Sequence, residues 1–324
     1  MKLKNIVVAT EKKGYYNVLE ESCKRHNIEL IPLGMGEEWT GFTKKFELWR
    51  DYLNTLDDNE IVMINDAYDV IILEDGDTII KKFKTFNKNI VMCTQNTSIL
   101  TKLIFGTCKN FDSVIASGSM IGYVKYLKKF TNLMFKYPNI WKKYKNDDQM
   151  IITGVCRYEN TFFKNNIVLD TDKKLFFATG GTEYIYNMIF KRILRLYMKN
   201  NKLYTDNNIT PSLLHLGGGL NGNVYLKYLN YKDIPNKNMF LINSYKTTQL
   251  IVFLNTIMTH KIIPLVFTIM SIITYLYFFK INIQNTILFI LIYTYLFGYY
   301  GLIPILVIVL LLSISIQYLF SFIK

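Results

Sequence analysis

The sequence predicts an α/β domain over residues 1–240, followed by an α-helical membrane region over residues 241–324. In the domain, short runs rich in Ile and Val alternate with runs of helical period, which is typical of a largely parallel sheet covered by helices on both faces. One of the Ile/Val runs carries acidic residues near its end, the edge at which such sheets bind ligands. Residues 250–324 contain only three charged side chains, all of them lysine.

The predicted elements of the domain follow one another in a regular order. Runs of β-branched residues between turn residues predict strands at 5–10, 28–34, 61–73, 89–94 and 113–123. Apolar residues at helical spacing predict helices at 15–26, 42–56 and 123–137. From residue 168 to 231 the pattern loosens, and the basic, aromatic stretch at 186–204 has the period of an amphipathic helix that rests on the domain or on a membrane.

The C-terminal region is long enough and apolar enough to cross a bilayer more than once. A hydrocarbon core about 30 Å thick needs about 20 apolar helical residues, and residues 262–279 and 286–323 are both apolar runs. Gly298, Gly301 and Pro304 divide the second run, so we expect two or three transmembrane helices, with three favoured. A buried helical core is the alternative, but the region leaves almost no polar residues to face water.

The distribution of charge and the N-terminal sequence indicate what the domain surface binds and on which side of a membrane the domain lies. Residues 250–324 hold three lysines and no Asp or Glu, which leaves +10 of the formal net charge of +13 to residues 1–249. The lysines of this part are mixed with acidic residues, which favours a solvated surface or attraction to anionic lipid over binding to nucleic acid. The N-terminal apolar run is too short for a secretory signal, so we expect the domain on the cytosolic side, in agreement with Lys237 and Lys246 ahead of the first span.

The cysteines show no spacing of the CxxC type. We therefore expect Cys23, Cys93, Cys108 and Cys156 to be reduced, mostly buried thiols rather than parts of a disulfide framework or a zinc site. Thiols in a reducing compartment stay in this form.

Asp66 and Asp69 interrupt the apolar run at 61–73, where a carboxylate without a partner resists burial. Acidic residues three positions apart at a strand end can turn toward one point, and their oxygens suit Mg²⁺ or Mn²⁺, ions that commonly bridge a protein to a diphosphate. A structural role in a turn or a helix cap is the alternative. His215 precedes three glycines, and a metal held by Asp66, Asp69 and His215 would explain both motifs, with the imidazole nitrogen favouring Mn²⁺.

Other segments contain residues suited to a ligand. The glycines after His215, among them Gly217 and Gly218, allow backbone N–H groups to approach phosphate oxygens closely, although the segment is also typical of a flexible loop. Asp147 and Asp148 stand where a helix is expected to start, so they either favour the helix dipole or bind sugar and acceptor hydroxyls. The small residues of "ASGSMIG" at 116–122 are typical of backbone that passes close to a ligand or to another segment.

The order of the motifs "VVAT", "LGMGEEWTGFTKK", "NDAYDVII", "ASGSMIGY", "DDQ" and "HLGGG" resembles the glycosyltransferase domain of the multifunctional procollagen lysyl hydroxylases, including their viral relatives, over about residues 3–235. This resemblance implies a GT-A type, Rossmann-like fold that uses a UDP-sugar donor and Mn²⁺, with Mg²⁺ as the alternative. The site residues that it implies are Asp66, Asp69 and His215 for the metal, Thr10 and Tyr68 for the uridine, Lys44 for positioning the donor, and Asp147 and Asp148 near the sugar and the acceptor.

Departures from the family pattern bear on the substrate. The segment "VMCTQNTSIL" at 91–100 stands where the family tends to have alanine and glutamate followed by tryptophan. Ala116 stands where asparagine is usual, Leu216 and Gly217 replace a glycine and an asparagine, and the loop before Lys44 is shortened. We expect these changes to affect the acceptor or sugar more than the metal. The iron-binding hydroxylase region of the family is not expected, because the chain after residue 235 continues into the apolar region.

These observations predict a membrane-anchored glycosyltransferase that transfers a hexose, glucose or galactose, from a UDP-sugar to a hydroxyl. The expected acceptor is hydroxylysine of a collagen-like protein, or else another protein, a glycan or a lipid. The alternative is a non-catalytic membrane protein whose transferase-like domain binds a nucleotide sugar or a partner without turnover. The changed residues after His215 and around Gln95 keep this alternative open.

Overall fold

The computed structural model describes residues 2–95, 102, 106–144, 147–179, 187, 192–193, 195–217 and 220–235. The predicted membrane region and Gly218 lie outside the described residues. Within the described part of the chain, no helix combines the length and the apolar composition that crossing a bilayer requires.

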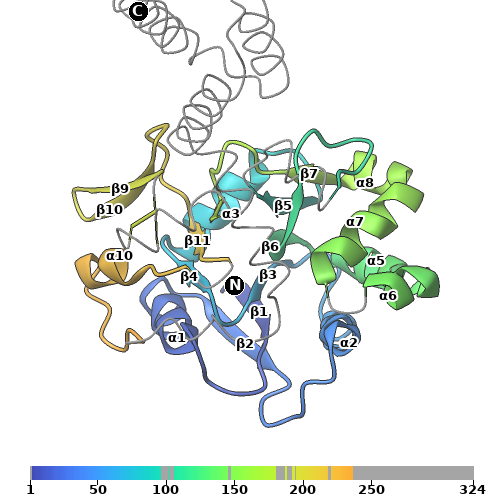
Figure 1. Cartoon of the computed structure of the whole chain (residues 1–324), viewed down its shortest axis with the longest axis horizontal. Coiled ribbons are helices and arrows are strands. Elements are labelled where there is room, and N and C mark those ends of the chain that lie inside the picture. Colours follow the sequence, from blue (N-terminus) through green and yellow to red (C-terminus); the bar gives the residue numbers. More distant parts are fainter. Residues whose placement is uncertain are drawn as a thin grey trace, which may run out of the picture. The chain divides into compact units, whose positions relative to one another are not determined.

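The predicted strands and helices occur in the predicted order, and the structure adds helices that the sequence analysis did not predict, such as α3, α6 and α8 (Figure 1). The strands are β1 Lys4–Val8, β2 Glu29–Leu33, β3 Ile61–Asp66, β4 Val70–Ile72, β5 Ile90–Thr94, β6 Ile115–Tyr123, β7 Ile167–Leu169, β8 Phe176–Ala178, β9 Leu196–Lys199, β10 Lys202–Thr205 and β11 Leu213–His215. The helices are α1 Tyr16–Arg25, α2 Phe42–Leu53, α3 Gly76–Lys84, α5 Val124–Phe135, α6 Pro138–Tyr144, α7 Asp148–Tyr158, α8 Asn160–Asn166 and α10 Asn223–Tyr228.

A six-stranded sheet forms the centre of the domain, in the order β2-β1-β3-β6-β5-β7. The pairs β1–β2, β1–β3 and β5–β7 are parallel, whereas β6 is antiparallel to both β3 and β5. The predicted largely parallel sheet is therefore confirmed, with β6 reversed. This reversal is possible without a crossover helix, because only parallel neighbours need one.

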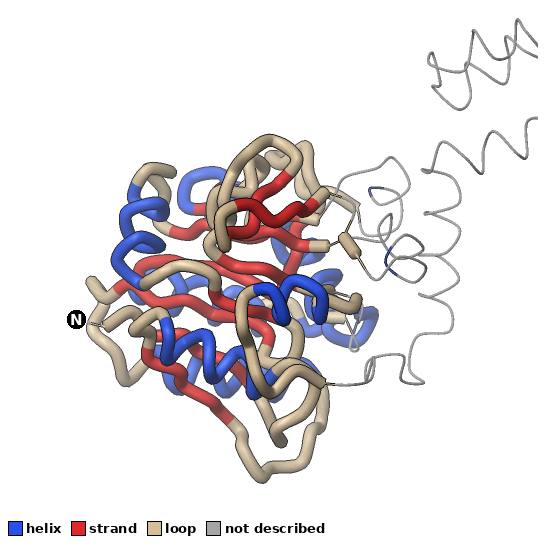
Figure 2. The backbone as a smooth tube through the Cα atoms, turned by 90° about the vertical axis from the view of Figure 1, so that its left-hand side faces the viewer, coloured by secondary structure: helices blue, strands red, loops and turns tan. Residues whose placement is uncertain are grey.

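Helices cover both faces of this sheet, and each face has its own apolar cluster (Figure 2). On one face, Phe46 and Trp49 of α2 pack with residues of α5 and α7. On the other face, residues of α1 and α3 such as Leu19 pack against the strands. Ile6 belongs to the first cluster and Val7 to the second, because successive side chains of β1 point to opposite faces.

The apolar run at 61–73 forms two strands that belong to different sheets. β3 ends at Asp66, residues 67–69 turn, and β4 pairs antiparallel with β11 in a three-stranded sheet of order β4-β11-β8. Asp66 thus ends β3 and Asp69 lies in the turn that follows, instead of both lying inside a buried strand. This break explains how an otherwise apolar run carries two carboxylates.

The stretch predicted as a basic amphipathic helix forms a β-hairpin in its described part. β9 and β10 pair antiparallel, and Asn200 and Asn201 between them have positive φ angles of 50° and 57°. Such angles belong to the two-residue turns that favour hairpins, and asparagine adopts them more readily than most residues. The helical prediction is wrong over 196–204, because a short alternation of apolar and polar residues also fits a strand with Leu196 and Leu203 facing the core.

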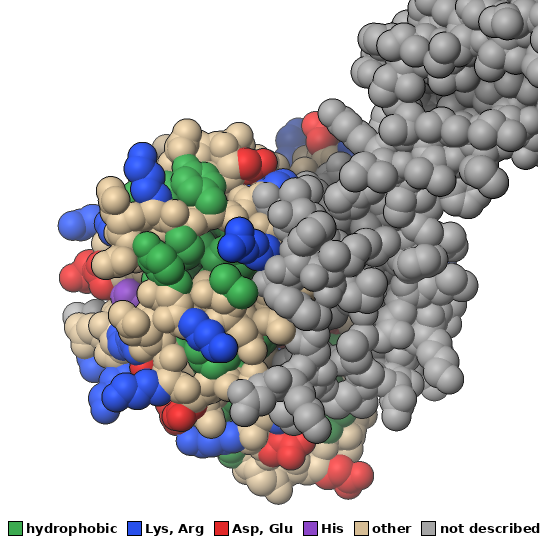
Figure 3. All heavy atoms as spheres, turned by 60° about the vertical axis from the view of Figure 1, so that its left-hand side comes forward, with side chains coloured by type: hydrophobic (Ala, Val, Ile, Leu, Met, Phe, Trp, Pro, Cys, Tyr) green, Lys and Arg blue, Asp and Glu red, His purple; other side chains and the backbone are tan. Residues whose placement is uncertain are grey.

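Figure 3 shows one face of the domain, on which Lys and Arg side chains are scattered among Asp and Glu side chains. Ion pairs such as Lys12 with Glu20 and Arg25 with Glu21 follow the same pattern. Exposed pairs of this kind contribute about 0–1 kcal/mol each. This face therefore has the mixed charge of an ordinary solvated surface.

The prediction of reduced thiols is wrong for Cys108 and Cys156, which form a disulfide with Cα atoms 5.8 Å apart. It is confirmed for Cys23 and Cys93, which are free and buried. The disulfide partners are 48 residues apart, so they meet through the packing of the segment before β6 against α7 and not through local spacing. Disulfides are typical of oxidising compartments, which weighs against the predicted cytosolic placement.

We expect thiol titration of the denatured chain to detect two free thiols without reductant and four after reduction. Cys156→Ser should lower the free energy of unfolding by about 2–4 kcal/mol, because a disulfide that closes a long loop restricts the unfolded chain. Urea unfolding measures the difference. As a control, reductant should lower the stability of the wild type but not that of Cys156→Ser. Four free thiols in the unreduced protein would contradict the disulfide.

Candidate active site

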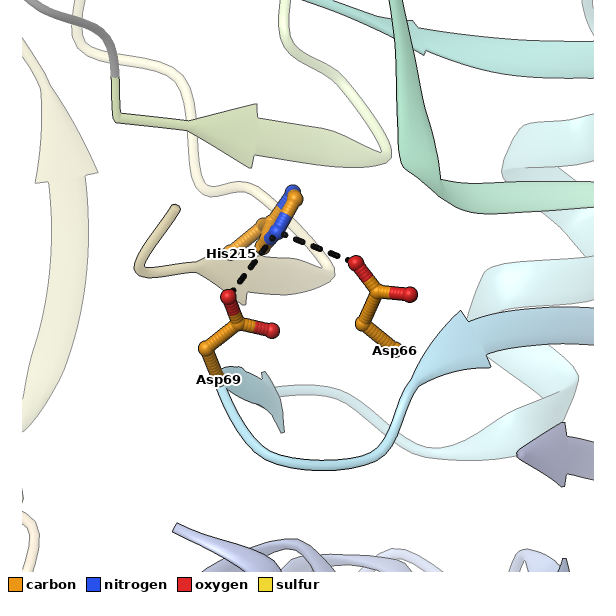
Figure 4. A group of neighbouring side chains, drawn as sticks. All are labelled: Asp66, Asp69 and His215. Carbon is orange, nitrogen blue, oxygen red and sulfur yellow. Dashed lines mark ion pairs between the residues drawn. The ribbon is translucent and has the colours of Figure 1, made fainter. Parts of the chain in front are cut away.

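Three side chains from two distant parts of the sequence meet beyond the carboxyl end of β3 (Figure 4). His215 Nε2 lies 3.4 Å from Asp69 Oδ2 and 3.7 Å from Asp66 Oδ2. All three candidate ligand atoms lie within 4.8 Å of one another. The structure therefore brings together the residues that the sequence predicts as metal ligands, and two carboxylates with an imidazole suit a divalent cation.

Strand pairing places His215 beside Asp66 and Asp69. β11 pairs with β4 so that His215 lies opposite Val70, and Leu216 N donates a hydrogen bond to Asp69 O at 2.7 Å. On the other side of β11, Thr179 N donates to His215 O at 2.9 Å. The backbone of His215 is thus fixed from both sides, which fixes the direction of its side chain.

The charges of the two acids act on the imidazole of His215. Burial alone would lower its pKa, but the adjacent carboxylates, Asp69 above all, raise the pKa of His215 well above its usual value. The protonated ring then offsets part of the negative charge of the group. A metal ligand must be the neutral imidazole, so metal binding would release a proton here.

Gly118 of β6 lies against this group of side chains. A Cβ atom added at Gly118 would lie 2.6 Å from Asp66 Oδ2 and 2.7 Å from His215 Nε2, in the space between the candidate ligand atoms. Asp69 Oδ1 is buried and has no hydrogen-bond partner among the described residues. The residues present therefore fit a divalent cation, and the space for it depends on glycine at position 118.

Lys44, the predicted donor residue, makes contacts away from these acids. Its Nζ lies 2.7 Å from Glu37 Oε2 and donates to Glu38 O at 2.8 Å. Both partners belong to the loop before α2. The predicted contact between Lys44 and a donor stays a prediction.

Sequence reasoning missed Lys45, which contacts two of the acids. Lys45 is only 5% exposed, and its Nζ lies 2.6 Å from both Asp66 Oδ1 and Asp148 Oδ2. Burial alone would lower its pKa, but the two carboxylates raise the pKa of Lys45 above its usual value. One signal could have revealed this lysine: it lies four residues before Trp49, on the apolar face of α2.

Asp147 and Asp148 are adjacent but occupy different environments. Asp147 caps α7, because its Oδ1 accepts a hydrogen bond from Met150 N at 2.9 Å, and burial raises the pKa of this carboxyl. Asp148 is buried, and Ser117 Oγ donates to its Oδ1 at 2.8 Å while Lys45 holds its Oδ2. The helix-start interpretation therefore describes Asp147, whereas Asp148 is joined to the candidate metal group through Lys45.

Thr10, Tyr68 and Gly217 lie around the same edge of the sheet. Thr10 N donates to the Tyr68 hydroxyl at 3.0 Å, which links the end of β1 to the turn after β3. A Cβ atom added at Gly217 would lie 3.6 Å from His215 Nε2. Gly217 thus lies beside the candidate metal group, and Thr10 is linked to Tyr68, which lies in the turn between Asp66 and Asp69.

Known proteins resemble this chain over the domain. The family model described as the PLOD GT domain matches residues 1–240. A procollagen-lysine,2-oxoglutarate 5-dioxygenase from Drosophila melanogaster is 28% identical over 252 residues, which cover 70% of this chain and 32% of the relative. A multifunctional procollagen lysine hydroxylase and glycosyltransferase from Caenorhabditis elegans is 27% identical over 206 residues, 57% of this chain and 27% of the relative.

This chain spans about a third or less of the length of these two curated relatives. Among solved structures, a glycosyltransferase involved in the glycosylation of the major capsid of PBCV-1 aligns with a TM-score of 0.39 and 11% identity. The alignment covers 70% of this chain and 98% of that protein.

We expect Gly118→Ala to weaken Mn²⁺ binding by about 100-fold or more, because its methyl group would fill the space between the ligand atoms. Titration calorimetry of the full chain with MnCl₂ measures the affinity. Ser119→Ala is the matched control, since Ser119 is buried on the same strand and points to the opposite face. Equal Mn²⁺ affinities of Gly118→Ala and the wild type would contradict the site.

Proposed function

The chain belongs to the PLOD GT domain family, and we propose that it is a membrane-anchored, metal-dependent glycosyltransferase that moves glucose or galactose from a UDP-sugar to a hydroxyl acceptor. The match to the family model over residues 1–240 identifies a glycosyltransferase domain on an α/β fold. The main support for metal dependence is the group Asp66, Asp69 and His215, whose ligand atoms lie within 4.8 Å of one another. Gly118 leaves open the space between these atoms. We take the fold to be of the GT-A type.

Asp66, Asp69 and His215 would hold the metal, and their two oxygens and one nitrogen favour Mn²⁺ over Mg²⁺. A bound divalent cation would neutralise negative charge that develops on the departing diphosphate. Three protein ligands leave coordination positions for phosphate oxygens. The backbone at Gly217, next to His215, lies where it could approach the same phosphates.

The remaining side chains of the site would bind and orient the two substrates. Tyr68 and Thr10, joined by a hydrogen bond, would bind the uridine at the end of β1. Asp148, with both oxygens held by neighbours, would orient a hydroxyl of the sugar or the acceptor. Asp147 contributes by starting α7, the helix that carries Asp148.

The acceptor and the membrane are the parts of this proposal that rest on sequence. The names of the relatives refer to procollagen lysine, so hydroxylysine of a collagen-like protein is the first acceptor to test, before other proteins, glycans or lipids. Anchoring rests on the apolar runs at 262–279 and 286–323. The cytosolic placement of the domain stays a prediction, and the Cys108–Cys156 disulfide argues against it.

A second candidate function is binding of a nucleotide sugar without turnover. One observation favours it: Gln95 lies in the segment where the family tends to have a glutamate, and its Nε2 donates to Gln149 Oε1 at 2.9 Å. The pair brings neutral amides to a position beside Asp148. If a carboxylate at this place is needed for turnover, the domain would bind a donor without transferring its sugar.

We expect the full chain to release UDP from UDP-glucose or UDP-galactose in the presence of MnCl₂ and a hydroxylysine-containing collagen peptide. Asp69→Asn should lower this rate by about 100-fold or more, because it removes a ligand charge with little change of shape. Asp58→Asn is the control, since Asp58 forms a surface ion pair with Lys128. Binding of both UDP-sugars without UDP release would favour the second candidate. Absence of donor binding would contradict both functions.

A further inference from the structure

Lys45 joins the candidate metal group to Asp148 through two short contacts. It stands in the first turn of α2, and its ammonium lies 2.6 Å from one oxygen of Asp66 and 2.6 Å from one oxygen of Asp148. The same ammonium lies 4.8 Å from the centroid of the Trp49 ring, which closes it off from water. A lysine in this position has little freedom to move.

In each of the two carboxylates, the two oxygens face different partners. Asp66 presents Oδ1 to Lys45, so Oδ2 is the oxygen that faces His215 and the candidate metal position. Asp148 presents Oδ2 to Lys45 and accepts a hydrogen bond from Ser117 through Oδ1. Lys45 therefore sets the rotation of both carboxyl groups and the separation between them.

We propose that Lys45 is a positioning residue that fixes Asp148 relative to the metal-binding Asp66, and that its positive charge weakens cation binding in return. The inference rests on the proposed function. Since the ammonium and the cation share one carboxylate, they repel each other, so the site would bind metal more tightly without Lys45. Turnover would suffer, because Asp148 would lose the contact that holds it at a fixed place.

These opposite effects separate positioning from a merely structural role. A lysine that only supports the fold would, when removed, lower metal affinity, turnover and stability together. Removal of a positioning lysine should raise metal affinity and lower kcat, with a smaller effect on the KM for the donor. The stem of Lys45→Met would still pack on Trp49, so the apolar contacts of α2 would be kept.

The test compares Lys45→Met with the wild type in the full chain. We expect the variant to bind Mn²⁺ about tenfold more tightly, and its kcat for UDP release from UDP-glucose or UDP-galactose to fall by about 100-fold at saturating Mn²⁺. Lys4→Met is the matched control, because Lys4 forms a partly buried ion pair with Glu60 at the opposite end of β1. We expect that control to keep the wild-type kcat and Mn²⁺ affinity.

Ser117→Ala tests the same idea without a change of charge, and it serves if Lys45→Met does not fold. It removes the second restraint on Asp148, so we expect kcat to fall by about tenfold with an unchanged Mn²⁺ affinity. Wild-type kcat in both variants, or a parallel loss of kcat and Mn²⁺ affinity in Lys45→Met, would overturn the inference. A wild type that releases no UDP would instead refute the proposed function. Mn²⁺ affinity would then still test the further inference, because a weaker affinity of Lys45→Met than of the wild type would refute the repulsion between Lys45 and the cation.

Discussion

The electrostatic repulsion among Asp66, Asp69 and Asp148 is the constraint on which the site depends. Carboxylates gathered at one edge of a sheet repel one another unless positive charge lies beside them. Lys45 supplies that charge between Asp66 and Asp148, and His215 supplies it beside Asp69 and Asp66, which raise the pKa of its imidazole. In the proposed enzyme a divalent cation takes over the compensation at His215, while Lys45 keeps its place at Asp148.

The fold places the positive groups beside the carboxylates by supplying these side chains from different elements. The turn after β3 separates Asp66 from Asp69, the pairing of β11 with β4 delivers His215, and the first turn of α2 delivers Lys45. Gly118 of β6 leaves the space among them open. Because these elements belong to the six-stranded sheet, the three-stranded sheet and a covering helix, the geometry of the site depends on how these three parts pack together. Gln95 lies outside this set, so we expect the changes around it to affect substrate binding more than the candidate metal group.

Much of this arrangement could be predicted from the sequence, and the remainder depends on packing between distant segments. Asp66 and Asp69 were identifiable because they conflict with the apolar run around them, and His215 because it stands before glycines. Lys45 was missed because its residue type is that of a surface side chain, and only the tertiary structure shows it buried. The Cys108–Cys156 disulfide and the reversed direction of β6 were missed for the same reason, since no local spacing encodes either of them.

The most direct test of the account is the position of Mn²⁺ in a crystal of the full chain, measured by anomalous X-ray diffraction. The account predicts one anomalous peak within coordination distance of Asp66 Oδ2, Asp69 Oδ2 and His215 Nε2, with Lys45 still in contact with Asp148. A crystal grown with Mn²⁺ that shows no peak among these three atoms, or a peak bound by other residues only, would contradict it.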